Sequence, residues 1–324
     1  MKNSFLTLLF CFTFSLGIAQ LNWKNVDSMF YPLPKSIQVF KTSETLKGRP
    51  NIAYYAIIDM KDKAILFDTD TTWQRRITPS QFYQKNHQPL IVVNCTFFSF
   101  QTNQNLSTVI KNGKTVSFNP NTIAGHGKNT LTYKHFLGSA IAISKNREVD
   151  VAWIYSDTAS NISFAQQFPF TPYKDSIAIH DLKFFKEHSK ATTNSANFRI
   201  LKKWKMKTAV GGGPVLIQKN EIKISNNEEL KFVEKAIDDK HPRTAIGFTK
   251  NNQLIILVIQ GRFPGIAEGA SLIEVAEILK VLECVEAINL DGGGSSCMLI
   301  NGKETIKPSD KEGQRAVPAV FLVK

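Results

Sequence analysis

Residues 287–302 read Ala-Ile-Asn-Leu-Asp-Gly-Gly-Gly-Ser-Ser-Cys-Met-Leu-Ile-Asn-Gly. The apolar run 285–290 predicts a buried strand that stops at Asp291, where three glycines follow. Glycine adopts positive φ and lets a ligand approach the backbone without a Cβ in the way. A second short strand, 297–300, ends in Asn301-Gly302, a strong hairpin signal. The stretch therefore predicts either a site built from a carboxylate, hydroxyls and N–H groups, or a tight hairpin capped by Asp291.

Composition narrows the class of protein and of partner. The chain has 324 residues, of which 43% are hydrophobic and 21% charged, a globular balance that excludes wholesale disorder. A net charge of +13 favours an anionic partner. Residues 183–207 form a strongly basic stretch that is either a polyanion-steering patch or a solvated face. No RNA-binding signature accompanies it, so nucleic acid is not expected as a partner.

The N-terminus predicts export. A short basic start precedes an apolar core at residues 5–18, and Gly17-Ile18-Ala19 fits a signal-peptidase site. Residues 1–19 are therefore interpreted as a cleaved signal peptide, with Gln20 as the mature start and a secreted or periplasmic protein as the product. The apolar run is short for a membrane span, so no span is expected after cleavage. The oligomeric state stays open.

The three cysteines that remain after cleavage, Cys95, Cys284 and Cys297, allow at most one disulfide. They cannot form a four-cysteine zinc site, and we expect them to be buried apolar residues. No cofactor and no metal are expected, because the sequence shows no recognisable cluster of His and Asp ligands.

The remaining chain is expected to form an N-terminal arm, residues 20–50, followed by one domain, residues 51–324. Hairpins are predicted for 52–59 with 64–68, 108–111 with 115–118, 139–144 with 149–155, and 245–249 with 254–260. Further strands are predicted at 90–93 and 319–323. Segments 119–129, which contains His126, and 157–172 are interpreted as irregular. The pattern indicates an α+β fold with twisted, largely antiparallel or mixed sheets.

Capping signals predict a few helices. Thr78-Pro79 opens one that runs to about Asn86, and Ser271 with Glu274 forms a capping box for another. A short helix is expected at 181–188. Helical spacing of apolar residues predicts a longer one at 228–238, capped by Asn227, with Leu230, Val233, Ala236 and Ile237 facing inward.

Two segments repeat weakly. The strand, triple glycine and strand at 209–217 resemble those at 287–300, and 139–146 resembles 244–251. An internal duplication would bring several polar strand ends to one shared cleft. Triple-glycine turns on opposite sides of the molecule would contradict this hypothesis.

Several ordered motifs resemble the phosphodiester glycosidase domain family from about Tyr54 to the C-terminus. The motifs are Pro242-Arg243-Thr244-Ala245-Ile246-Gly247, Gly261-Arg262, Gly269 with Glu274, Asn289-Leu290-Asp291-Gly292-Gly293-Gly294-Ser295-Ser296, Asn301-Gly302 and Arg315-x-Val317. Upstream, Asn94-Cys95-Thr96-Phe97-Phe98 stands where the family usually has Asn-Gly-Gly-Phe-Phe. Gln260 stands where an Asp often precedes the Gly-Arg pair.

The resemblance implies hydrolysis of a sugar-1-phosphodiester, such as a GlcNAc-1-phosphodiester, to free sugar and a phosphomonoester. Asp291 would act at the anomeric carbon as nucleophile or base, with Glu274 and Glu268 as candidate second carboxylates. Arginine side chains and glycine-turn N–H groups would grip the phosphodiester. The expected substrate-binding residues are Asn94, Arg243, Thr244, Arg262, Asn289, Gly292, Gly293, Gly294, Ser295 and Arg315.

Two other readings remain open. A non-catalytic module would bind an anionic exported glycan in the same cleft, which the replaced glycines at Cys95-Thr96 favour. A metal-dependent phosphodiesterase would cut the other ester bond and would need metal ligands. Ser295 is not expected to be a nucleophile, because Cys297 occupies the last glycine position of the Gly-x-Ser-x-Gly elbow.

Overall fold

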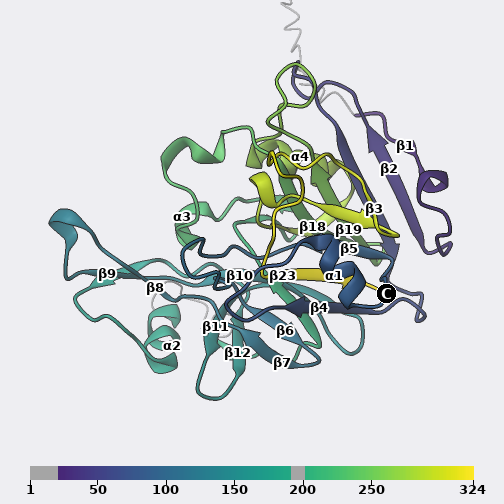
Figure 1. The fold of residues 1–324 in the computed structure, drawn as a ribbon. Coiled ribbons are helices and arrows are strands. Elements are labelled where there is room, and N and C mark those ends of the chain that lie inside the picture. Colours follow the sequence, from purple (N-terminus) through teal and green to yellow (C-terminus); the bar gives the residue numbers. More distant parts are fainter. Residues whose placement is uncertain (1–20, 191–200) are drawn as a thin grey trace, which may run out of the picture.

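A computed structural model describes residues 21–190 and 201–324 (Figure 1). The predicted signal peptide, residues 1–19, lies outside the described residues, as do positions 191–200 of the basic stretch. Within the described part every strand pairing is antiparallel, and four α-helices accompany the sheets. The α+β prediction is confirmed.

An eight-stranded sheet forms the backbone of the molecule. Its strands, in spatial order, are β1 (Lys24–Asn25), β2 (Ile37–Thr42), β3 (Ala53–Asp59), β19 (Gln253–Ile259), β18 (Arg243–Thr249), β20 (Cys284–Asn289), β16 (Val215–Gln218) and β17 (Glu221–Ile222). The segment expected to be an arm thus supplies two strands, and β2 pairs with β3 along its whole length.

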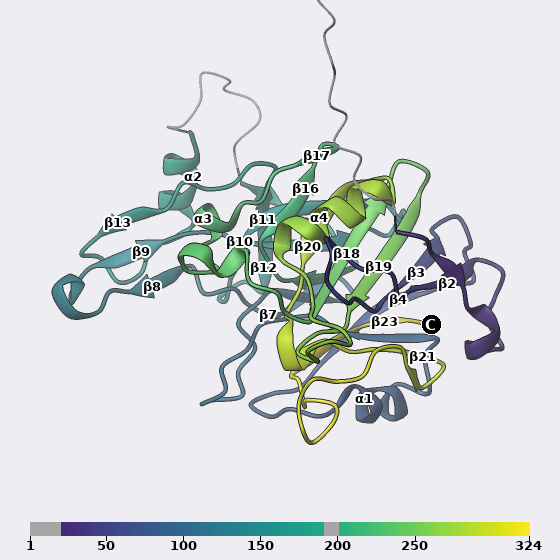
Figure 2. The ribbon, with the colours of Figure 1, turned by 90° about the horizontal axis from the view of Figure 1, so that it is seen from above.

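A seven-stranded sheet packs against it. Its order is β14 (Lys202–Lys203), β12 (Ile162–Gln166), β11 (Val149–Asp157), β10 (Gly138–Ile143), β15 (Thr208–Gly211), β6 (Val109–Lys111) and β7 (Lys114–Ser117). A small sheet of β13 (Tyr173–Asp175), β9 (Tyr133–His135) and β8 (Thr122–Ala124) projects beside α2 (Leu182–Lys190) (Figures 1 and 2).

A five-stranded sheet contains the last strand of the predicted domain. Its order is β22 (Lys303–Glu304), β21 (Met298–Ile300), β5 (Ile91–Asn94), β23 (Ala319–Val323) and β4 (Phe67–Thr71). Helix α1 (Pro79–Lys85) covers its outer face, where Phe82 packs on Val92 and Leu322. The predicted cap at Thr78 is present, and Gln81 completes it as the reciprocal partner of a capping box.

The main hydrophobic core lies where the three large sheets face one another. Ile246 and Ile288 of the eight-stranded sheet, Trp153 of the seven-stranded sheet, and Val93 and Phe321 of the five-stranded sheet belong to one buried cluster. Because alternate strand residues point to opposite sides, the neighbours of these residues form separate outer cores. The sheets therefore hold the strand ends between them in fixed relation.

Helix α4 (Leu272–Val281) covers the outer face of the eight-stranded sheet (Figure 2). It begins at Ser271, whose hydroxyl accepts from the Glu274 N–H in the predicted capping box. Leu272, Val275 and Leu279 are fully buried, and the helix packs mainly against strands β20 and β16. The helix leads almost directly into β20, so it positions the strand that ends just before Asp291.

Three irregular or hairpin predictions are wrong. Segment 64–68 does not pair with 52–59: β4 begins at Phe67 and pairs with β23, because β2 and β19 already flank β3. Segment 157–172 contains strand β12, which pairs with β11. Segment 119–129 contains strand β8 and the 3₁₀ turn Gly127–Asn129. The β4–β23 pairing is long-range and β8 has only three residues, so neither leaves a clear local pattern, whereas β12 forms a local hairpin with β11 that the prediction missed.

The long helix predicted at 228–238 is also wrong. The helix α3 (Asn226–Glu229) is a single turn that begins after Ser225, and Leu230 then adopts φ of 50°. The Asn226 side chain donates to the carbonyl of Phe232 and accepts from its N–H, which folds the chain back on itself. A separate 3₁₀ turn, Glu234–Ile237, follows. The side chain of Val233, predicted to face inward, is 79% exposed.

The two triple-glycine turns lie side by side. The Gly213 N–H donates to the carbonyl of Asn289 at 2.8 Å. The strands before the two turns also have equivalent partners. Strand β15 pairs with β10 in the seven-stranded sheet, β20 pairs with β18 in the eight-stranded sheet, and both β15 and β20 lead into a glycine turn. This arrangement fits the hypothesis of an internal repeat.

The cysteines follow the buried-apolar prediction. Cys95, Cys284 and Cys297 are all free and buried. Across residues 21–190 and 201–324, no helix has the length and apolar character needed to cross a bilayer.

Candidate functional site

Asp291 lies at the centre of the candidate site, immediately after β20. The register of β20 is fixed by its pairing with β18, in which Asn289 faces Ala245. The Leu290 N–H then donates to the carbonyl of Thr244, and the Asp291 N–H donates to that of Cys95 at 2.8 Å. The backbone of Asp291 thus bridges the eight-stranded and five-stranded sheets.

Asn94 ties three segments together at this point. Its Nδ2 donates to the main-chain carbonyl of Asp291 at 2.6 Å, and its Oδ1 accepts from the Thr244 hydroxyl at 2.8 Å and the Cys297 N–H at 3.0 Å. Both Asn94 and Thr244 are fully buried. The structure therefore brings these predicted residues together, and their polar atoms bond to protein atoms.

The glycine turn is tightly bonded as well. The N–H of Gly293 donates to the carbonyl of Pro242, and those of Ser295 and Ser296 donate to carbonyls of the turn itself. Gly293 has φ of 62°, a conformation that favours glycine. Most N–H groups of this turn thus already have partners, which limits the backbone cradle expected for phosphate.

The Asp291 carboxylate has an unusual electrostatic environment. Burial raises its pKa to about 6, against the opposing effects of a hydrogen bond from Ser295, the charge of Arg315, the Gly292 N–H and the charge of Lys231. Desolvation outweighs the cations here because a carboxylate surrounded by protein loses its hydration. A carboxyl that titrates near neutral pH is typical of an acid–base or nucleophilic group.

Two of the predicted arginines flank the glycine turn. A Cβ placed on Gly293 would lie 2.9 Å from Nη2 of Arg262, and one on Gly294 would lie 2.2 Å from Nη2 of Arg315. The absence of side chains there lets both guanidinium groups approach the backbone. Arg315 is held by a two-bond pair with Asp310, at 2.7 and 2.8 Å, and its Nη1 reaches the Ser295 hydroxyl at 3.5 Å.

Arg262 and Arg243 differ in how many of their guanidinium N–H groups donate hydrogen bonds to protein atoms. The Arg262 side chain is exposed, and it has no hydrogen-bond or ion-pair partner within the described residues. Arg243 is buried, with Nε donating to the carbonyl of Ala270 and Nη2 to that of Asp239. Burial lowers the pKa of Arg243 to about 10. Arg243 thus anchors the segments around β18 with at least two of its donors.

The candidate second carboxylates have structural partners. Glu274 Oε2 accepts from the Ser271 N–H at 2.8 Å, and Oε1 pairs with Nζ of Lys240 at 2.6 Å. Glu268 pairs with Arg49 at 2.7 Å across the surface between two loops. Glu274 therefore uses both carboxylate oxygens at the start of α4.

Two residues that the sequence did not single out adjoin the site, Glu229 and Lys231. A Cβ on Gly213 would lie 2.3 Å from Oε2 of Glu229 and 2.6 Å from Cε of Lys231. Burial raises the pKa of Glu229 and lowers that of Lys231, and the attraction between the two charges opposes both shifts. Lys231 also lies 5.0 Å above the ring of Phe97. The broken helix at 226–237 brings both residues here, so helical periodicity could not reveal them.

Asn289 joins the same corner. Its Nδ2 donates to the carbonyl of Gly213 at 2.9 Å, while its buried Oδ1 has no hydrogen-bond partner within the described residues. A buried acceptor without a partner costs free energy and marks a place where a ligand or water donor fits. A continuous group of polar residues therefore lies beside Asp291. It comprises the two glycine turns, Asn289, Glu229 and Lys231.

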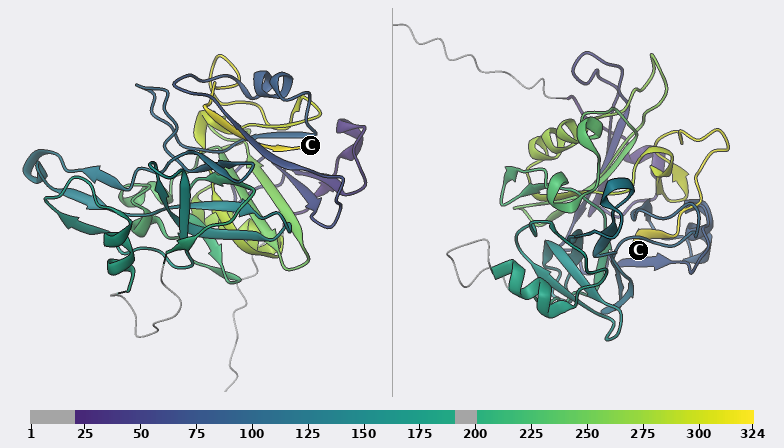
Figure 3. Two further views of the ribbon diagram at one scale, coloured as in Figure 1. Left: turned by 90° about the horizontal axis from the view of Figure 1, so that it is seen from below. Right: turned by 90° about the vertical axis from the view of Figure 1, so that its left-hand side faces the viewer.

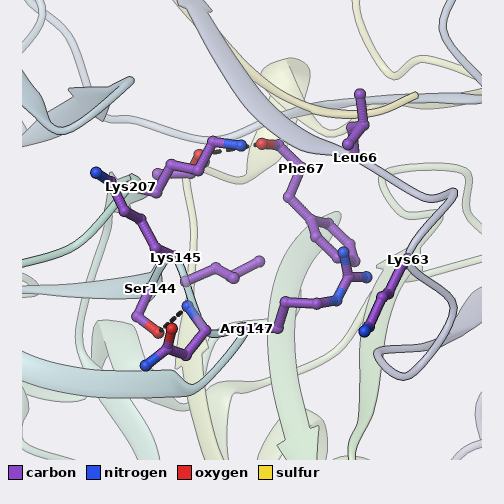
Figure 4. A pocket seen from close by; sticks show the side chains of 10 residues that line it. Lys63, Leu66, Phe67, Ser144, Lys145, Arg147 and Lys207 are labelled. Carbon is purple, nitrogen blue, oxygen red and sulfur yellow. Dashed lines mark hydrogen bonds between the residues drawn. The ribbon is translucent and has the colours of Figure 1, made fainter.

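Positive charge also gathers away from Asp291. A pocket of about 430 Å³ is lined by Lys63, Lys145, Arg147 and Lys207 (Figure 4). Arg147 donates to the carbonyls of Met60, Asp62 and Ile65, so its side chain is fixed. Elsewhere, His135, Asp175 and His180 form a cluster of possible metal ligands that the sequence order had not indicated.

Comparisons with known proteins find relatives in both sequence and fold. The sequence profile of the phosphodiester glycosidase family matches residues 87–324. The N-acetylglucosamine-1-phosphodiester alpha-N-acetylglucosaminidase of Mus musculus is 33% identical over 102 residues, covering 31% of this chain and 19% of that protein. The Bos taurus protein of the same name is 43% identical over 68 residues, covering 21% and 12%. The matched segments thus span less than a fifth of either relative.

Solved structures share the fold over most of the chain. The zebrafish N-acetylglucosamine-1-phosphodiester alpha-N-acetylglucosaminidase catalytic domain, auto-inhibited by its pro-peptide, has a TM-score of 0.55 and 18% identity, with coverage of 91% of this chain and 85% of that one. A hypothetical protein from Synechocystis has a TM-score of 0.60 and 17% identity, with coverage of 93% and 63%. At these identities the structures show similarity of fold alone.

Proposed function

Because the chain belongs to the phosphodiester glycosidase family, we propose that it hydrolyses a sugar-1-phosphodiester to a free sugar and a phosphomonoester. The observation that carries the proposal is the placement of Asp291: a carboxyl with a pKa of about 6 that feels the charges of Arg315 and Lys231. The names of the relatives favour an N-acetylglucosamine-like sugar.

In the proposed reaction the sugar ring lies over Asp291 and the phosphodiester faces the cations. The ionised carboxylate either attacks the anomeric carbon or takes a proton from the attacking water. The bond between that carbon and the bridging oxygen breaks, and its electron pair stays on the phosphate. Arg262, Arg315 and Lys231 stabilise the negative charge that develops there.

A phosphate leaving group needs little protonation, so the reaction requires less acid catalysis than an ordinary glycoside does. This removes the need for a second carboxyl acid close to Asp291. We therefore assign Glu274 to the start of α4 and Glu268 to its surface pair with Arg49, on the basis of their partners. Asn94 and Thr244 are assigned to holding Asp291 in position, and Asn289 Oδ1 to accepting a substrate hydroxyl.

The test is an assay of the purified protein with UDP-GlcNAc and a GlcNAc-1-phosphodiester. Turnover to free sugar and phosphomonoester that is lost in Asp291→Ala supports the proposal. Release of a sugar phosphate would exclude it, because that product arises from the other ester bond.

A second candidate function is a non-catalytic module that binds an anionic glycan. The basic pocket around Lys63, Lys145 and Lys207 favours it, since these lysines leave their ammonium groups available to an anion. Tight, salt-sensitive glycan binding without turnover, weakened in Lys145→Ala, would support the module. Turnover that is insensitive to Lys145→Ala supports the enzyme.

We also propose that the protein acts after export, supported by the signal-like residues 1–19. Mass spectrometry of the secreted or periplasmic protein should find Gln20 as the first residue. An intact Met1 on the mature protein would contradict the cleavage.

A further inference from the structure

Strands β8, β9 and β13 and helix α2 form a lobe at one side of the molecule (Figures 1 and 3). Three side chains from separate segments of this lobe lie close together. His135 on β9 is fully buried, and its Nε2 lies 3.0 Å from Oδ1 of Asp175 on β13. Nε2 of His180, in the connection before α2, lies 2.7 Å from Oδ2 of the same carboxylate. One atom from each residue lies within 4.8 Å of the others, so a single ion can bring the three together with small side-chain rotations.

The surroundings of His135 fit a ligand. Its Nδ1 lies 3.0 Å from the hydroxyl of Thr122 on the neighbouring strand β8. When this hydroxyl accepts the proton of Nδ1, the Nε2 atom keeps its lone pair and points toward Asp175. A partner on the far nitrogen is the usual way in which proteins fix the tautomer and orientation of a metal-bound histidine.

His180 is held in place from the side. Its ring stacks on Phe184 of α2, with 3.5 Å between ring centroids and 6° between planes. It also contacts the ring of His135 edge-on, at 4.4 Å. The stacking leaves the Nε2 atom free to face the carboxylate, and His180 and Asp175 are both partly exposed, so an ion can enter from solvent.

The three strands of the lobe contribute little apolar surface to a core, although α2 buries Phe185 in the main core. Strands β8, β9 and β13 have three residues each, and His135 is their only buried residue. A small sheet whose central contact is polar gains little from burial of apolar surface, and a structural metal commonly supplies the missing stability in such units. The cluster links β9, β13 and the connection before α2, and it adds to the strand pairing of β9 with β8 and β13 and to the ring contacts of Phe184 with His135 and Tyr173.

We propose that His135, Asp175 and His180 bind one divalent transition-metal ion, with Zn²⁺ as the expected occupant, which holds the lobe together. Two imidazole nitrogens and one carboxylate oxygen suit Zn²⁺, whereas Mg²⁺ and Ca²⁺ prefer oxygen ligands alone. Three protein ligands leave a fourth position for water. On binding, the carboxylate exchanges its hydrogen bonds from the imidazoles for a bond to the metal, and the His135 proton resides on Nδ1 beside Thr122.

The test titrates the purified, chelator-treated protein, free of any histidine tag, with ZnSO₄ by calorimetry and with CoCl₂ by visible absorption. We expect one ion per chain with a dissociation constant of about 1 µM or below and the absorption bands of four-coordinate Co²⁺. His180→Gln and Asp175→Asn should each weaken Zn²⁺ binding by at least about 100-fold. His126→Gln, an exposed histidine in the same lobe, is the matched control and should bind as the wild type does.

Two results would overturn the proposal. Wild-type protein that shows no saturable Zn²⁺ binding up to about 100 µM would identify the cluster as a purely hydrogen-bonded group. Equal binding by the wild type and His180→Gln would place the ion elsewhere. The cobalt spectrum of the wild type shows whether the protein binds a metal ion at all. This result needs no variant, so misfolding of a variant cannot obscure it.

Discussion

Nδ2 of Asn94 donates to the main-chain carbonyl of Asp291 at 2.6 Å, joining residues 197 positions apart in the chain. The same amide accepts from Thr244 through Oδ1, so the ends of β5, β18 and β20 meet at one buried side chain. This contact fixes the backbone that carries Asp291, and it leaves the Asp291 carboxylate as the reactive group. Substitutions at the Asp291 carboxylate should therefore change the reaction more than the fold.

Replacing Asp291 with Asn should abolish turnover while keeping the fold. We expect kcat for UDP-GlcNAc to fall at least about 1,000-fold, because an amide can neither attack the anomeric carbon nor accept a proton. The variant should also gain about 1–3 kcal/mol of stability to urea unfolding at pH 8, since the wild type must ionise a carboxyl whose pKa is raised from 3.8 to about 6. Wild-type turnover in this variant would remove Asp291 from the mechanism.

The pH dependence of activity should report the same carboxyl. Because the pKa of Asp291 is raised to about 6, the ionised form is lost as pH falls through that value, and kcat/KM should drop about tenfold per pH unit below it. The stability contribution has the opposite sign: the protonated form favours the fold, and that contribution is lost as pH rises from about 4 to 6.

Glu286 provides a second carboxyl with a raised pKa, and it supplies the control for this pH profile. Burial raises the pKa of Glu286 to about 7, and its carboxylate accepts from the Val151 N–H. Glu286→Gln should leave the acidic limb of the kcat/KM profile unchanged. If the acidic limb disappears in Glu286→Gln, the limb reports the Glu286 carboxyl instead of the Asp291 carboxyl, which contradicts the prediction.

Alanine substitutions of Arg262 and Arg315 should distinguish a residue that only binds substrate from one that also stabilises the fold. Arg262→Ala should raise KM by about 10- to 100-fold with little change in melting temperature, because its exposed guanidinium has no partner in the described part of the chain. Arg315→Ala should lower both kcat/KM and melting temperature, because it also breaks the pair with Asp310. Arg49→Ala, at a surface pair, is the control for both. An unchanged KM in Arg262→Ala would exclude a phosphate contact.

Gly213→Ala should destabilise the protein well beyond the cost of an unfavourable φ. Its φ is 116°, and the new Cβ would lie 2.3 Å from Oε2 of Glu229, a fully buried carboxylate that accepts hydrogen bonds from Ser139, Val215 and Ser225. Gly265→Ala, with φ of 72° and open space around the Cβ position, should cost about 1–2 kcal/mol. We expect Gly213→Ala to cost at least about 2 kcal/mol more in urea unfolding. Equal losses would mean that the Glu229–Lys231 corner tolerates a side chain.

Local signals in the sequence predicted most strands and three of the four helices. The helix start at Thr78-Pro79, the capping box at Ser271 and the hairpin of 108–111 with 115–118 are short-range patterns, and the structure confirms all three. The partner of β4 could not be predicted, because strand pairing across the chain is decided by packing. The helix expected at 228–238 failed because the side chain of Asn226 bonds the backbone of Phe232 and turns the chain.

The candidate site was only partly accessible from sequence. The motifs placed Asn94, Thr244 and Asp291 near one another, and the structure brings them into direct contact. The capping box with Ser271 had indicated a structural role for Glu274, but the sequence could not reveal its pair with Lys240 or the main-chain partners of Arg243. Lys231, Glu229 and the His135 cluster also required coordinates, since each assembles from segments without a shared pattern.

The most direct test of the central claim is hydrolysis of a sugar-1-phosphodiester in water enriched in ¹⁸O, followed by ³¹P NMR of the phosphomonoester. If Asp291 directs attack at the anomeric carbon, the bridging oxygen stays on phosphorus and the phosphomonoester carries no label. Attack at phosphorus would place one ¹⁸O in the phosphomonoester, and its isotope-shifted ³¹P signal would contradict the account.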